Sequence, residues 1–173
     1  MDIAILRLIH IAAGAFWVGA LYAFFLLVQP SAVAIGPGGQ PFMYHLLHEK
    51  RFSVILLASA ITTVLAGIVL LWITTDGFQA DLLFDASRLG YTVGGAAAIL
   101  ALGLGGLYVF PRTRIVERTL GAAITQGRPP TDDERATLMR AGAESRRAGV
   151  WVLIGVGIAV ICMATARYWS LFL

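Results

Sequence analysis

The stretch that decides the fold runs from Ile3 to Val28 and reads IAILRLIHIAAGAFWVGALYAFFLLV. Its only basic side chains are those of Arg7 and His10, and it contains no acidic residue. About 20 mostly apolar residues suffice for a helix to cross a bilayer, and nothing in the stretch alternates between apolar and polar as a strand would. The run is too long for a signal peptide and lacks the basic leader of one. We therefore expect a membrane-spanning α-helix.

Three further stretches have the same character, and charged residues make up only 13% of the 173-residue chain. A soluble domain has about twice that share. We predict an all-α protein, an integral membrane four-helix bundle that forms a single transmembrane domain over residues 1–173. The helices are expected at about 3–28, 42–74, 88–110 and 132–169, and the breaks at Pro30–Pro41, Asp76–Gly77 and Arg128–Pro130. A capping box, Thr131 to Glu134, is predicted to begin the last helix.

Basic residues are distributed unequally between the two ends of this bundle. Of the 13 lysines and arginines, ten fall at 50–51 and within the connection 111–147, and the other three are Arg7, Arg88 and Arg167. The positive-inside rule then predicts an inner cell membrane protein whose termini both lie outside. We expect the connection 111–147 to be a cytoplasmic helical hairpin that touches anionic lipid headgroups. Its arginines are interspersed with acidic residues, so we do not expect a nucleic-acid site.

Ionisable groups inside a span are costly and are usually functional. At about 100° per residue, Arg7, His10 and Gly14 share one face of the first helix. The same spacing recurs at the start of the third span, and this match is compatible with two parallel two-helix repeats. The residues that we expect to meet at the outer side are Arg7, His10, Gly14, Arg88, Tyr91, Gly95 and Arg167.

A histidine beside several arginines suits an anionic ligand that carries a metal. A b-type haem fits this description, because His10 could bind the iron while the arginines pair with the propionates. Met163 is expected at about the right depth for a weak second axial ligand; without it the iron is five-coordinate. The alternative is that the arginines extend separately to lipid headgroups and that His10 bonds a main-chain carbonyl of a neighbouring helix.

Two more histidines stand at the opposite, inner end of the second helix, in Met43-Tyr-His45-Leu-Leu-His48-Glu49. Histidines at positions i and i+3 share a helix face and could hold a metal such as copper, or a second haem, with Met43 nearby. The other interpretation is an amphipathic turn at the membrane boundary.

The run from Arg7 and His10 through Trp17-Val-Gly19 to Tyr22, followed by Arg51-Phe52-Ser53, resembles a known superfamily. That superfamily joins the copper-resistance D proteins and the J-type protoporphyrinogen oxidases, and the resemblance covers the helices of the first half. It implies a four-helix membrane fold and a histidine, here His10, that is associated with haem or porphyrin. The oxidases have lysine where this chain has Arg7 and Arg88.

The function we predict is therefore that of a b-type haem-binding membrane protein active in electron transfer or small-ligand haem chemistry. A porphyrinogen oxidase-like enzyme, a copper-handling protein and a non-catalytic membrane anchor subunit are the alternatives. The expected partners are the lipid bilayer and a redox protein or quinone, either in a homo-oligomer or as a subunit of a larger membrane complex.

Overall fold

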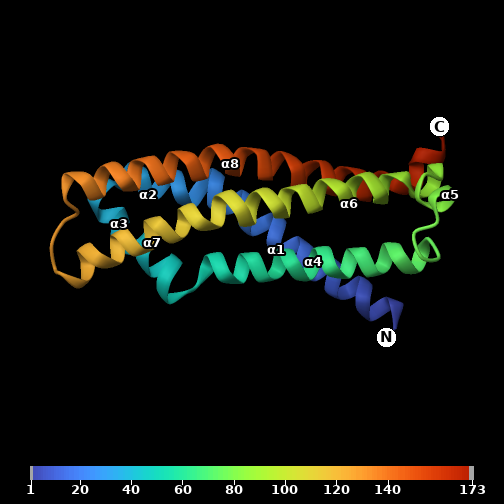
Figure 1. Ribbon diagram of the computed structural model, residues 1–173, viewed down its shortest axis with the longest axis horizontal. Helices are drawn as coiled ribbons and strands as arrows, with labels where there is room; N and C mark the ends of the chain where they lie inside the picture. Colours follow the sequence, from blue (N-terminus) through green and yellow to red (C-terminus); the bar gives the residue numbers. More distant parts are fainter. Residues whose placement is uncertain (1, 172–173) are drawn as a thin grey trace.

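The computed structural model describes residues 2–171, and within that range it is helical without strands (Figure 1). Four continuous helical runs are long and apolar enough to cross a membrane. These runs are Ile3–Glu49, Phe52–Thr74, Ala86–Thr125 and Asp132–Leu171. The prediction of an all-α chain with four apolar helices is thus confirmed.

The first run continues past the predicted break at Pro30. Helix α1 (Ile3–Ala23) begins at Asp2, whose carboxylate accepts a hydrogen bond from the main-chain N–H of Ala4 at 3.0 Å. A π-helical turn, η1 (Phe24–Val28), leads into α2 (Gln29–Ile35). Pro30 directly follows this π-helical turn, where the main-chain hydrogen bonds already depart from the α-helical pattern, and the helix continues through it. The chain turns only at Gly36, whose φ of +71° favours glycine.

A tight helical hairpin follows this turn. The 3-10 turn η2 (Gly36–Gly38) leads into α3 (Gly39–Tyr44), which folds back against α2 so closely that a Cβ on Gly39 would lie 2.1 Å from the carbonyl oxygen of Ala32. A second π-helical turn, η3 (His45–Glu49), continues α3.

The predicted helix 42–74 is interrupted just before the membrane span. Arg51 adopts a left-handed conformation with φ of 49°, and α4 (Phe52–Thr74) begins immediately after it. The π-helical turn η3 ends at this break, where the N–H of Lys50 donates a hydrogen bond to the carbonyl oxygen of His45 at 3.0 Å. The sequence has no glycine or proline here to signal the interruption.

The second half of the chain contains two longer helical runs. After the short α5 (Ala80–Leu83), α6 (Ala86–Leu104) passes through the π-helical turn η4 (Gly105–Val109) into α7 (Phe110–Thr125). This run extends well beyond the predicted end at residue 110, and Pro111 lies within it just after the π-helical turn η4.

The last run, α8 (Asp132–Thr165), ends in a 3-10 turn, η5 (Ala166–Leu171). Its predicted capping box is confirmed, since the side chains of Thr131 and Glu134 each accept a hydrogen bond from the main chain of the other. Helix α7 packs against α8. Together with α2 and α3, α7 and the first part of α8 form an extension of the bundle at the end opposite both termini (Figure 1), and its charged residues make α7 and the start of α8 the polar part of it.

The four spans associate as two pairs, α1 with α4 and α6 with α8. The two pairs meet along a narrow core to which Trp17, Leu21, Val152 and Val156 contribute. The Tyr22 hydroxyl also ties α1 to α8 by donating to the carbonyl of Leu153 at 3.0 Å. Large apolar side chains remain exposed along all four spans. An apolar outer surface of this kind is expected for a helical bundle that is surrounded by lipid.

Candidate functional site

His10 lies on the side of α1 that packs against α4. Its Nδ1 is 2.8 Å from the main-chain carbonyl oxygen of Thr63. A Cβ on Gly67, one turn further along α4, would lie 2.8 Å from Cε1 of the imidazole, so the ring occupies the space that this glycine leaves free. Nε2 makes no hydrogen bond with residues 2–171, and the side chain as a whole is half-buried.

The hydrogen-bond partner of this imidazole determines which nitrogen donates. A carbonyl oxygen can only accept a hydrogen bond, so Nδ1 carries a proton. The hydrogen bond to a main-chain carbonyl of a neighbouring helix is the one that the alternative interpretation of His10 expected.

Neighbouring residues of α1 differ in what they contact. Arg7, one turn before His10, is exposed and makes no hydrogen bond or ion pair with any described residue. Gly14, one turn after His10, faces α4, where a Cβ would lie 3.2 Å from the Thr63 methyl group. Gly14 thus serves the packing of α1 on α4 in this arrangement.

The other two arginines predicted for the site have partners of their own. Arg88 lies 3.8 Å from the carboxylate of Asp85, the N-cap of α6. Hydrogen bonds from the hydroxyl and the main-chain N–H of Ser87 lower the pKa of Asp85, and the charge of Arg88 adds to this effect. The guanidinium of Arg167 lies 4.6 Å from the centre of the Tyr168 ring and also donates to the Tyr168 hydroxyl.

The remaining predicted residues belong to the α6–α8 pair. Met163 packs at the helix interface, where a Cβ on Gly94 would lie 2.8 Å from its Cγ. Tyr91 is exposed, and Gly95 has open space where a side chain would be. Arg7 is near the start of α1, Arg88 and Tyr91 are near the start of α6, and Arg167 is in η5. These parts of the chain lie toward the end that contains the termini (Figure 1). Within the described chain, however, no hydrogen bond or ion pair joins α1 to Arg88, Tyr91 or Arg167.

The histidine pair at the other end of α4 has a different environment. His45 is exposed, whereas His48 has its Nδ1 3.0 Å from the carboxylate of Glu117 and its ring stacked on Tyr44 at 4.9 Å. The second oxygen of Glu117 accepts from Arg114 at 2.9 Å. In the described part of the chain, no three histidine, cysteine, aspartate or glutamate side chains are grouped closely enough to hold a metal ion.

Glu117 is the polar residue that the sequence analysis missed. It is 7% exposed and lies in α7, where it ties this helix to η3. The connection 111–147 contains many acidic and basic residues, and such a pattern indicates a solvent-exposed glutamate. The signal available was its i,i+3 spacing to Arg114 on a helix with an apolar face.

We expect Glu117→Ala to lower the free energy of unfolding by about 1–2 kcal/mol, because the variant loses two hydrogen bonds to a charged group. Solvent screens both interactions of Glu117, because the side chains of His48 and Arg114 are 51% and 39% exposed, and this screening keeps the expected loss small. Denaturant titration in detergent measures it. The matched control is Glu144→Ala, which breaks an exposed pair with Arg112 and should cost less than about 0.5 kcal/mol. Equal losses would contradict a structural role for burial at Glu117.

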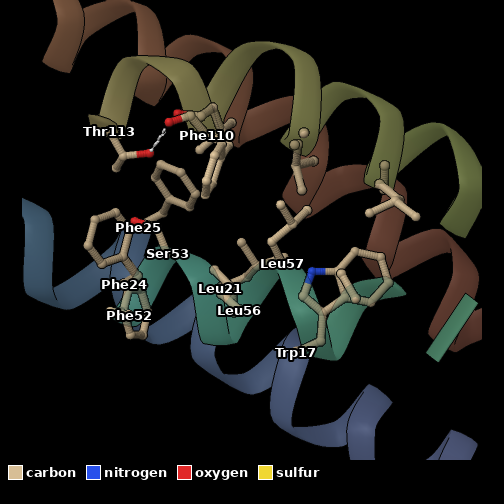
Figure 2. Close-up of a pocket in the computed structure, with 17 residues that line it drawn as sticks. Trp17, Leu21, Phe24, Phe25, Phe52, Ser53, Leu56, Leu57, Phe110 and Thr113 are labelled. Atoms are coloured by element: carbon tan, nitrogen blue, oxygen red, sulfur yellow. Dashed lines mark hydrogen bonds between the residues drawn. The ribbon is translucent and has the colours of Figure 1, made fainter. Parts of the chain in front are cut away.

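A cavity of about 50 Å³ lies between the two helix pairs (Figure 2), and His10 does not line it. Trp17 stands toward one end, and Phe24, Phe25 and Phe52 gather toward the other with Ser53 (Figure 2). None of the residues predicted to bind haem lines it. Its volume is far too small for a porphyrin, so a haem would have to lie elsewhere.

Comparison with known proteins adds no relative: no protein-family profile, no curated protein and no solved structure matches the chain. The geometry of the site is therefore the basis for any functional proposal. What the fold and the site define is a multi-pass membrane helical bundle with an available imidazole nitrogen on its first span.

Proposed function

We propose that this protein binds a b-type haem through Nε2 of His10 and acts in electron transfer or small-ligand haem chemistry. The observation that supports the proposal best is the 2.8 Å contact between Nδ1 and the carbonyl of Thr63. Metal-binding histidines commonly donate one ring N–H to a carbonyl or carboxylate, which fixes the tautomer and makes the other nitrogen a better ligand. His10 has this arrangement before any ligand arrives.

The charge of α1 suits the carboxylates of a haem. Arg7 is on the same helix face as His10 and has no acidic partner among the described residues. A guanidinium can hold a carboxylate through two parallel hydrogen bonds. Arg7 would therefore pair with a propionate, while Arg88 and Arg167 would have to leave Asp85 and Tyr168 to do the same.

The number of protein ligands also follows from the packing. Met163 lies between α6 and α8, whereas His10 lies between α1 and α4. We infer that His10 would hold the haem at this site without help from Met163. A haem held in this way would supply one-electron chemistry or bind a small molecule.

The topology completes the proposal. The basic polar extension would lie in the cytoplasm and both termini outside the inner cell membrane, as the positive-inside rule requires. His10 would then be in the outer half of the bilayer. The bound group would lie against the α1–α4 pair from the lipid side, because the cavity between the pairs is small and lies elsewhere.

Titration of the detergent-purified protein with haemin tests the proposal. We expect saturable binding of one haem per chain and a Soret band that is displaced from that of free haemin. Absence of both a Soret band in the purified protein and saturable uptake on titration would overturn the proposal.

Copper binding at the inner end is the second candidate, and a specific observation favours it. Nδ1 of His48 contacts the carboxylate of Glu117 at 3.0 Å, which again leaves Nε2 as the free nitrogen. His45 would have to supply the second ligand from the preceding turn. Equilibrium dialysis with copper distinguishes this candidate, since binding should disappear when both histidines are replaced by alanine and should persist in His10→Ala.

A further inference from the structure

A second, more open hollow lies on the outside of the bundle, between the start of α7 and the middle of α8. It measures about 250 Å³ and is lined by Tyr108, Arg112, Glu144, Arg147, Ala148 and Trp151. The continuous apolar part of α8 begins at Ala148, and the polar extension lies on the other side of this residue. The cleft is therefore at the level where hydrocarbon gives way to lipid headgroups.

The charges of this cleft do not cancel. Arg112 donates from Nε to the carboxylate of Glu144 at 3.1 Å and lies 5.3 Å from the centre of the Tyr108 ring. Arg147 makes no hydrogen bond or ion pair within residues 2–171. Two guanidinium groups and one carboxylate leave a net charge of one positive unit at the mouth of an otherwise apolar groove.

We propose that this cleft is a binding site for the phosphodiester headgroup of an anionic membrane phospholipid. The free guanidinium of Arg147 would donate to the phosphate oxygens, and one negative charge would neutralise the cleft. Trp151 and Tyr108 are 65% and 49% exposed, and their flat amphipathic rings would lie beside the glycerol and the first part of the acyl chains. Glu144 disfavours a headgroup with more than one negative charge.

Native mass spectrometry of the purified protein with phosphatidylglycerol or phosphatidylcholine tests the site. We expect phosphatidylglycerol to be retained preferentially and Arg147→Ala to weaken its binding about fivefold, the contribution of one interfacial arginine. The matched control is Arg146→Ala, which removes an exposed arginine that does not line the cleft. It should leave phosphatidylglycerol binding nearly unchanged.

A variant of opposite sign makes the test sharper. Glu144→Gln raises the net charge of the cleft and should strengthen phosphatidylglycerol binding, whereas loss of any helix packing would weaken it. Equal losses in Arg146→Ala and Arg147→Ala, or equal retention of the two lipids, would overturn the proposal. Displacement of the lipid by excess inorganic phosphate alone would assign the cleft to a free anion and contradict the lipid assignment.

Discussion

Replacing His10 with alanine is expected to abolish the Soret band of the haem-loaded protein while the bundle stays folded. The variant loses the imidazole whose Nε2 makes no hydrogen bond with residues 2–171, and no other histidine lies on α1. The cost to stability is about 1 kcal/mol, that of one neutral hydrogen bond. Absorbance spectra of equal amounts of folded protein, with far-ultraviolet circular dichroism as the test of folding, measure the effect.

The control for this result is His48→Ala, which removes a histidine at the opposite end of the bundle and should leave the band unchanged. Free imidazole added to His10→Gly should restore part of the absorbance by replacing the missing side chain. A Soret band of full intensity in His10→Ala would exclude His10 as the iron ligand.

Gly67→Ala is expected to weaken haem binding while His10 is still present. The new methyl group would lie 2.8 Å from Cε1 and 3.1 Å from Nδ1 of His10, so the ring would have to turn away from the carbonyl of Thr63. Loss of such an orienting contact typically weakens metal binding by about 10–100-fold, and we expect haem affinity to fall by that factor. The comparison is Gly19→Ala on α1, where nothing lies within 4 Å of the added methyl group.

The sequence was sufficient to predict the four spans and the cap of α8, because both depend on local composition. Long apolar runs require helices in lipid whatever their neighbours are, and the Thr131–Glu134 box is satisfied within one turn. Pro30 was misleading as a predicted break. The helix continues through Pro30 directly after the π-helical turn η1, whose main-chain hydrogen bonds already depart from the α-helical pattern, and this turn has no signal in the residue pattern.

The site was harder to predict, because helix pairing decides which faces meet. Equal spacing suggested that His10 and Tyr91 would be oriented alike, yet His10 faces its partner α4 and Tyr91 is exposed on α6. The contacts of His10 involve Thr63 and Gly67, which are more than fifty residues away and unremarkable in an apolar segment. No periodicity within one helix can identify such a partner.

The second large effect is expected from Gly90→Ala in the α6–α8 pair. A Cβ at this position would lie 2.7 Å from the Cα of Ala166 and 2.8 Å from the carbonyl oxygen of Cys162. Both of these are backbone atoms, so no side chain can rotate to make room, and the two helices would have to separate. Overpacking of this kind costs about 1–3 kcal/mol, and we expect a lower free energy of unfolding in detergent by that amount.

Gly95→Ala, five residues further along α6, separates this packing effect from helix propensity. Its new methyl group meets nothing within 4 Å, and alanine favours a helix over glycine by about 1 kcal/mol. The two variants should therefore shift stability in opposite directions when compared by thermal or denaturant unfolding. If both were stabilising, close contact between α6 and α8 at Gly90 would be contradicted. Gly90 lies in the α6–α8 pair, whereas His10 lies in the α1–α4 pair. The haem affinity of the folded Gly90→Ala protein should therefore be unchanged.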